Sequence, residues 1–250
     1  MDNKSFVRYK IFQEFANIEA FTSTKTSFQK DRVRFTGDEE TVYSDNRKEL
    51  ARLLNIEIGQ LVFPRQTHSD AVCDLDSVPK SEISDTDALV TNKPGICLCV
   101  QTADCVPVLL FDPEKKVIAA VHAGWRGTVA KIVANTVNVM KEKYGCDPKT
   151  ILVAIGPSIG PEVYEVGDEV VEAVRRSIPN AEDVLIKHKS GKFHVDLWVA
   201  NRNVLLECGI PIENIEVLAE CSFQGEKKYF SARREGVDTG RMVSGIMMIS

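Results

Sequence analysis

Residues 96–122, ICLCVQTADCVPVLLFDPEKKVIAAVH, decide the fold that this sequence predicts. They contain three apolar runs of strand length, which are Ile96–Gln101, Val106–Phe111 and Val117–His122. Polar residues and the turn pair Asp112-Pro113 separate these runs. The connections are too short for the crossovers that parallel neighbours need, so we expect hairpins within a mixed sheet.

The last of these runs breaks at Ala-Gly-Trp-Arg-Gly and leads into an amphipathic pattern. Apolar residues recur at helical spacing over residues 128–144, which predicts a long helix. Thr128 is placed as its N-cap, and Gly145 as the residue that follows its C-terminus.

Strand and helix signals alternate along the rest of the chain. We expect strands at 6–12, 88–91, 151–155 and 215–218, helices at 43–54, 167–178 and 196–207, and a helix-like stretch after Arg233-Arg234. Repeats, low-complexity tracts and linkers are absent from the sequence. The prediction is one compact domain over residues 1–250, of the α+β or mixed α/β class, with a mixed β-sheet covered by helices.

Composition restricts the partners of the chain. The formal charge is −5, with 44% hydrophobic and 27% charged residues, which is ordinary for a globular protein and unlike the basic surface of a nucleic-acid binder. No apolar run reaches the roughly 20 residues of a membrane span, and the N-terminus lacks the apolar core of a secretory signal. We expect a cytoplasmic protein whose seven cysteines are thiols.

Metal ligands are the strongest candidates for chemistry. The chain has four histidines, of which His68 and His122 lie at strand ends beside small or polar residues, and Cys105 lies where a strand resumes. Two imidazoles and a thiolate suit zinc or copper, and three protein ligands leave a position open for catalysis. Spacing alone also fits hydrogen-bonded core residues. His188, among lysines, is expected in a solvated loop, and His194 in a short strand.

Several motifs together resemble one family. QTHSDAV, TDALVT, CVQTADCVPVLLFDP, VHAGWRG, AIGPSIGP, DLWVANRNVLLECGI and YFSARRE…TGRM occur in order from about residue 36 to the C-terminus. They are similar to the YfiH/YlmD family, also called the laccase-domain or purine nucleoside phosphorylase/polyphenol oxidase family. The N-terminal segment departs from that pattern, and Gln29 stands where relatives tend to have asparagine.

The resemblance implies a metal site and a reaction. It assigns His68, Cys105 and His122 as metal ligands, and implies phosphorolysis of adenosine, inosine or methylthioadenosine, with adenosine deamination as a companion activity. Zinc would acidify a bound water. Copper also suits the ligands, so a copper-dependent polyphenol oxidase with weak activity on phenols stays an alternative. A full laccase needs a further trinuclear copper cluster, which four histidines cannot supply.

Other residues are candidates for proton handling and substrate binding. Asp104 and Asp70 could move protons or orient a ligand. Gly124 and Arg126, before the long predicted helix, could bind phosphate, and so could Arg233; Gln66 of the Q-x-H segment is a further substrate contact. Tyr164 and Trp125 could stack on a purine, although such aromatics are usually core.

Two readings from other classes stay open. Cys105 and His122 could form the nucleophile and base of an amidase acting on cell-wall precursors, as has been suggested within the family. The chain could also be a metal-binding module without turnover. A monomer or a small homo-oligomer fits either reading.

Overall fold

Two mixed β-sheets packed face to face form the centre of the structure, a computed structural model that describes residues 6–28, 32–37 and 40–249. One sheet has the strand order β1-β2-β14-β6-β3, with bounds Phe6–Val7, Ile18–Ser23, Met242–Met248, Cys97–Thr102 and Leu61–Val62. The other has the order β13-β9-β7-β8-β5-β4, with bounds Ile215–Val217, Leu152–Ile155, Val106–Asp112, Val117–Ala123, Ala88–Thr91 and Val72–Asp74. Each contains both parallel and antiparallel pairs, so the predicted mixed-sheet α+β class is confirmed.

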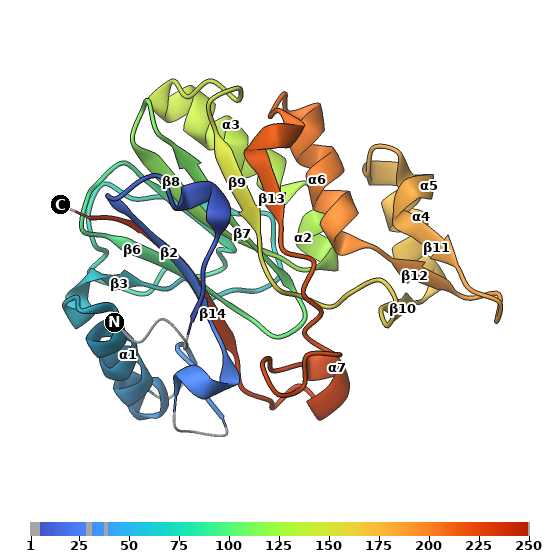
Figure 1. Ribbon diagram of the computed structural model, residues 1–250, viewed down its shortest axis with the longest axis horizontal. Helices are drawn as coiled ribbons and strands as arrows, with labels where there is room; N and C mark the ends of the chain where they lie inside the picture. Colours follow the sequence, from blue (N-terminus) through green and yellow to red (C-terminus); the bar gives the residue numbers. More distant parts are fainter. Residues whose placement is uncertain (1–5, 29–31, 38–39, 250) are drawn as a thin grey trace.

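Helices cover the outer faces of this pair of sheets (Figure 1). On the six-stranded sheet lie α2 (Trp125–Val129), α3 (Ile132–Tyr144) and α6 (Leu197–Glu207). On the five-stranded sheet lies α1 (Glu40–Leu54), where Leu50 and Leu54 pack against Cys97 and Cys99. Between the sheets, Leu98 and Val100 of β6 share a core with Leu109 of β7 and Ile118 of β8.

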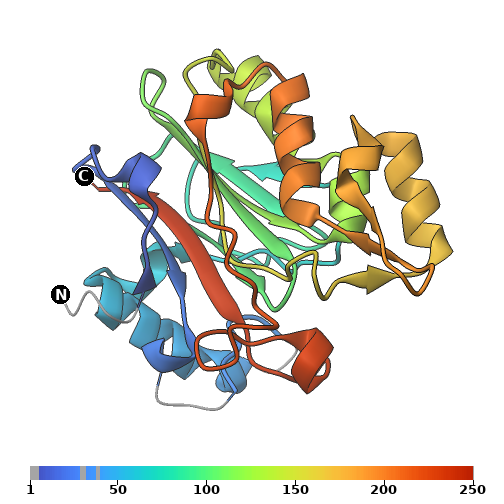
Figure 2. The same ribbon diagram turned by 45° about the vertical axis from the view of Figure 1, so that its right-hand side comes forward.

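A small antiparallel sheet projects beside α6 (Figure 2). It has the order β10-β12-β11, with bounds Glu165–Val166, Phe193–Val195 and Leu185–Lys187. Helices α4 (Asp168–Ser177) and α5 (Ala181–Val184) accompany it. No helix among the described residues is both long and apolar enough to cross a membrane.

Most predicted elements are confirmed with shifts of a few residues. Of the expected hairpins among residues 96–122, β7–β8 is confirmed, with Pro107 paired to His122, whereas β6 and β7 form none because they lie in different sheets. Helices α1, α4 and α6 lie where the sequence predicts them, and Asp196 caps α6 by accepting the Val199 amide at 2.9 Å. Gly145 ends α3 in the left-handed conformation, with φ 68°.

Three local predictions are wrong. The first strand covers only Phe6–Val7, because the chain turns through a short 3₁₀ helix, Lys10–Phe12, and carries Phe12 into the core. The predicted helix 128–144 is two helices. Lys131 breaks it with φ 58°, and the Thr128 hydroxyl accepts the Asn201 amide instead of capping.

The C-terminal stretch is the third. Helix α7 (Ala232–Glu235) is one turn, and the residues beyond it form β14 in the middle of a sheet. Every residue of β14 is buried, so its sequence shows no alternation of polar and apolar side chains. A short buried segment without such alternation does not distinguish a strand from a buried helix.

Candidate metal centre

Cys105, His68 and His122 come together at one end of the six-stranded sheet. Cys105 directly precedes β7, and His122 is the second-last residue of the neighbouring strand β8. His68 lies in the loop before β4. Because β7 and β8 are antiparallel, the start of one strand meets the end of the other, and residues 17 positions apart become neighbours.

The three side chains form a compact set, called here the ligand cluster. One ligand atom from each lies within 4.8 Å of the others. The Cys105 Sγ is 3.7 Å from the His68 Nε2, and the two imidazole rings meet edge to face at 4.8 Å. A tetrahedral zinc ion with ordinary bond lengths separates its sulfur and nitrogen ligands by about 3.6 Å. The donor set and its spacing therefore fit a transition-metal ion.

Asp87 holds both histidines in place. This carboxylate lies just before β5 with none of its surface exposed. One oxygen accepts the His122 Nδ1 at 2.7 Å and the His68 amide at 3.0 Å; the other accepts the amides of Thr67 and Ser69 at 3.1 and 2.8 Å, and the Ser69 hydroxyl at 2.7 Å. The His122 Nε2 is thus left to face the cluster, the arrangement of carboxylate, histidine and metal that fixes the ring and its tautomer.

The loop that carries His68 depends on these bonds. His68 has φ 63°, a left-handed conformation that few residues other than glycine adopt. Because of this turn, the backbone amides of Thr67, His68 and Ser69 all point at the Asp87 carboxylate. The Gln66 side chain fixes the start of the loop by pairing with the backbone of Gln101 in β6, through two bonds of 2.8 Å.

Gly124 is required beside the cluster. A Cβ at this position would lie 2.9 Å from the His68 ring and 3.1 Å from the Cys105 Sγ. Both contacts are shorter than van der Waals separation. The glycine of the His-Ala-Gly motif therefore makes room for two of the three ligands.

Mutual charge strongly perturbs the pKa values of the cluster. Burial opposes ionisation of the Cys105 thiol, but the charge and hydrogen bonds of His122 and His68 outweigh it and lower the pKa of Cys105 to about 6. Burial likewise opposes protonation of His122, but Cys105 and Asp87 raise the pKa of His122 to about 9. Burial would raise the pKa of Asp87, yet His122 and Ser69 lower it to about 2. The thiolate that a metal requires is therefore favoured at neutral pH.

The cluster opens into a cleft of about 710 Å³. This cavity is called here the site cleft. Besides the ligand cluster, the residues that line it are Arg34, Thr36, Gly37, Arg65, Gln66, Gln101, Ala103, Asp104, Ile159, Tyr164, Ala232, Arg233, Val237 and Arg241. Its volume lies within the range of small-molecule sites.

The structure places the other predicted site residues unevenly. Gln66, Asp104, Tyr164 and Arg233 line the site cleft, and the Arg233 guanidinium lies over the Tyr164 ring at 5.3 Å. Both oxygens of Asp104 are engaged at 2.7 Å, one by the Ser222 hydroxyl and one by the Arg233 amide.

Other candidates lie outside the lining as the described residues define it. The exposed Arg126 guanidinium stacks on Trp125 at 4.4 Å, and Trp125 packs against the core under the six-stranded sheet. Asp70 is exposed and bonds Asn135 at 3.3 Å. Gln29 lies outside the described residues.

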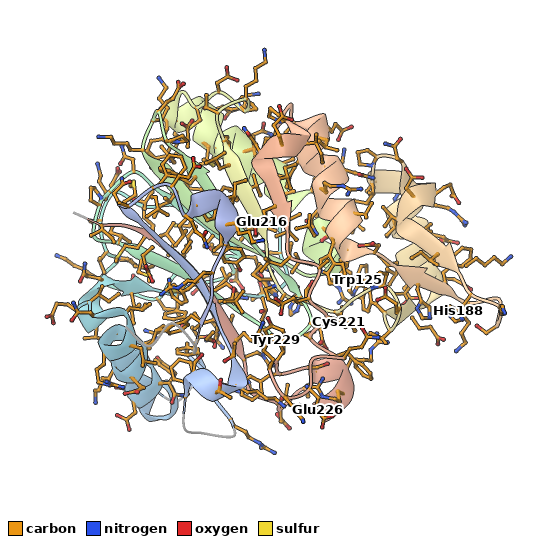
Figure 3. The ribbon with its side chains drawn as sticks, viewed as in Figure 1. Trp125, His188, Glu216, Cys221, Glu226 and Tyr229 are labelled. Carbon is orange, nitrogen blue, oxygen red and sulfur yellow. The ribbon has the colours of Figure 1, made fainter. Side chains whose placement is uncertain are left out.

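The remaining histidines lie together elsewhere. His188, directly after β11, stacks on His194 of β12 at 4.7 Å, and Figure 3 shows His188 well to the side of Trp125. The His194 Nδ1 donates to the Pro161 carbonyl at 2.7 Å. Among the described residues they are not part of the ligand cluster.

Asp87, Arg34 and Arg241 are not among the site residues predicted from the sequence. Asp87 bonds His122, and the two arginines line the site cleft. The signal for Asp87 was an acidic residue at the edge of the apolar run TDALVT. The signal for Arg241 was its place in the TGRM motif, whereas Arg34 lies in the divergent N-terminal segment and carried no signal.

Comparisons with known proteins show the family and the fold of the chain. The sequence model of a family described as multi-copper polyphenol oxidoreductase laccase matches residues 22–249. The chain is 37% identical to a purine nucleoside phosphorylase of Bacteroides thetaiotaomicron, over 98% of this chain and 97% of that protein. It is 40% identical to adenosine deaminase RL5 from an unknown prokaryotic organism, over 85% and 84% of the two chains. Its fold matches the crystal structure of YlmD from Geobacillus stearothermophilus with a TM-score of 0.90 and 28% identity, over 100% of this chain and 98% of that one.

Proposed function

Because this chain belongs to the YfiH/YlmD purine nucleoside phosphorylase family, we propose that it cleaves purine nucleosides with inorganic phosphate. The proposed substrates are adenosine, inosine and methylthioadenosine. Deamination of adenosine is the proposed companion activity, supported by the name of one relative. The observation that carries the proposal is the convergence of three metal-ligand atoms within 4.8 Å in a cleft of nucleoside-binding size.

The proposed metal is zinc. Two imidazole nitrogens and one thiolate suit zinc, and all three side chains line the cleft. Zinc there would supply a Lewis acid and lower the pKa of a bound water to about 7. His68, Cys105 and the Nε2 of His122 would hold it, and Asp87 would keep the second nitrogen of His122 protonated.

The cleft offers contacts for both substrates. We assign Tyr164 to the purine, since it is an aromatic side chain in the lining of the cleft. Of the substrate and phosphate contacts expected from the sequence, Gln66 and Arg233 line the cleft, whereas Gly124 and Arg126 do not. For Asp104 we propose a positioning role, because its two bonds tie the start of β7 to Ser222 and to Arg233 of α7.

The experiment is product analysis with metal-characterised protein. Adenosine and phosphate are incubated with it, and mass spectrometry follows adenine, inosine, hypoxanthine and ribose 1-phosphate. Phosphorolysis should give adenine and ribose 1-phosphate, and Cys105→Ala should give neither. If wild-type protein forms none of these products, the proposal fails.

A cysteine hydrolase is the second candidate, and one observation favours it. The pKa values of about 6 for Cys105 and about 9 for His122 describe a thiolate beside an imidazolium, the pairing of a cysteine nucleophile and its base. Chelation separates the two candidates. A metal-dependent phosphorylase loses activity on chelation and regains it with zinc, whereas a metal-free hydrolase is unaffected by chelators and is inactivated by alkylation of Cys105.

A further inference from the structure

Two arginines lie side by side on the wall of the site cleft. The Nη2 atoms of Arg34 and Arg241 both donate to the carbonyl of Val237, at 3.1 and 2.9 Å. Arg241 is also held by the carbonyls of Thr239 and Gly240, at 2.6 and 3.1 Å. The two guanidinium groups, called here the arginine pair, are thus fixed against one shared acceptor although they carry like charges.

Within the described residues, little negative charge balances this pair. Asp238 is 3.8 Å from Arg34, but 83% of its side chain is exposed, so water screens it. Asp104 is the acidic residue in the cleft lining, and both of its oxygens are already bonded. Burial, and then the charge of Arg34, lower the pKa of Arg241. A chain with a net charge of −5 therefore concentrates positive charge in this cleft, which also holds Arg65 and Arg233.

The pair has donors to spare. A guanidinium carries five N–H groups. With described residues, Arg34 forms one hydrogen bond to a carbonyl and Arg241 forms three. Planar guanidinium groups bind phosphate through paired hydrogen bonds, with defined geometry as well as charge.

We propose that Arg34 and Arg241 bind the inorganic phosphate that attacks the nucleoside. This inference rests on the proposed function and adds the place of the second substrate. A phosphate oxygen forms a bond to C1′ of the ribose as the bond from C1′ to the purine nitrogen breaks. The electron pair stays on that nitrogen, which takes up a proton, so ribose 1-phosphate and the free base form without oxidation or reduction.

The start of α2 is the competing place for phosphate. That helix has five residues, Gly124 closes directly onto His68 and Cys105, and Arg126 stacks on Trp125. The arginine pair instead shares the cleft with the ligand cluster. Substitution of each arginine distinguishes the two places.

The experiment compares phosphorolysis with deamination in the same variants. Arg34→Gln and Arg241→Gln should each raise KM for phosphate by roughly 10- to 100-fold, the cost of a lost charged hydrogen bond. Deamination of adenosine, which uses no phosphate, should stay within about twofold of wild type. Arg52→Gln, an exposed arginine paired with Glu49 on α1, is the control and should change neither rate. Arg34→Gln is the milder change, because Arg241 supports three backbone carbonyls.

Equilibrium binding of radiolabelled phosphate to the zinc-loaded protein provides a readout that does not need turnover. Binding should weaken by the same factor in both variants. Unchanged phosphate binding and KM in both, or an effect confined to Arg126→Gln, would overturn the inference. The inference would also be overturned if the two variants lost binding of AMP but kept binding of free phosphate. The arginine pair would then bind the phosphate group of a nucleotide instead of inorganic phosphate. If wild type binds phosphate through the pair but forms no ribose 1-phosphate, the proposed function fails and the anion site stands.

Discussion

Replacing Asp87 by asparagine should weaken zinc binding while leaving the three proposed ligands, His68, Cys105 and His122, unchanged. The carboxylate accepts five hydrogen bonds, divided between its two oxygens. An amide has one oxygen and one NH2 group. In either orientation, the NH2 group must face at least two donors.

The two orientations differ in what they damage. If the NH2 group faces His122, the ring must turn its Nδ1 into an acceptor and carry its proton on Nε2, which blocks the metal-binding nitrogen. If the NH2 group faces Thr67 and Ser69, the turn that presents His68 loses its amide bonds. Each donor left unpaired costs about 1–3 kcal/mol, so unfolding should become easier by about 2–6 kcal/mol. Zinc affinity should fall about 10- to 100-fold.

Asp112→Asn is the matched control. Asp112 is also fully buried, accepts the amides of Glu114 and Lys115 at 2.9 and 3.1 Å, and lies at the other end of β7 from Cys105. Zinc affinity is measured by competition with a chromophoric chelator, and stability by urea unfolding of the metal-free protein. Ser69→Ala, which removes one bond to Asp87, gives a milder test if Asp87→Asn does not fold. Wild-type zinc affinity in folded Asp87→Asn would refute the reasoning.

Three further results are expected. Gly124→Ala should lower zinc affinity at least about 10-fold by titration, because its Cβ would meet two ligands, whereas Gly59→Ala, with open space around it, should not; equal affinities would remove the packing argument. Burial alone would raise the pKa of Glu235, but hydrogen bonds from Lys25, Thr239 and Arg234 lower it to about 2, below the unfolded value of about 4.3. The contribution of Glu235 to stability is therefore present above pH 4.3 and is lost as the pH falls toward 2. Urea midpoints from pH 6 to 2.5 should therefore fall less steeply in Glu235→Gln, and parallel curves would contradict this. His188→Ala, far from the cluster, should keep the zinc content of wild type by elemental analysis, and a loss of metal would place that histidine in the site.

The sequence predicted the site better than it predicted the local structure around it. His68, Cys105 and His122 were named from residue chemistry and motif resemblance, and the structure brings them together through the predicted hairpin. The breaks at Lys131 and in Lys10–Phe12 depend on tertiary contacts, which no periodicity encodes. The fully buried β14 carries no alternation that would identify it as a strand.

Contacts between residues far apart in the sequence were the other feature that could not be predicted. Asp87 accepts from residues 18 to 35 positions away, and Arg34 and Arg241 meet across about 200 positions at one carbonyl. Neither arrangement follows from local sequence, since Asp87 meets His122 across the paired strands β5 and β8, and Arg34 and Arg241 belong to distant segments of the chain that meet only in the folded protein. The aspartate of TDALVT, Asp87, indicated only that a carboxylate beside an apolar run needs hydrogen-bond donors, and the sequence did not identify those donors.

The most direct test of the metal-dependent phosphorylase is elemental analysis of purified protein, joined to a chelation and reconstitution cycle. We expect about one zinc per chain in wild type and none in Cys105→Ala. Phosphorolysis of adenosine should be lost on chelation and restored by stoichiometric zinc. Protein that contains no metal, or stripped protein that keeps full activity until Cys105 is alkylated, would contradict the account.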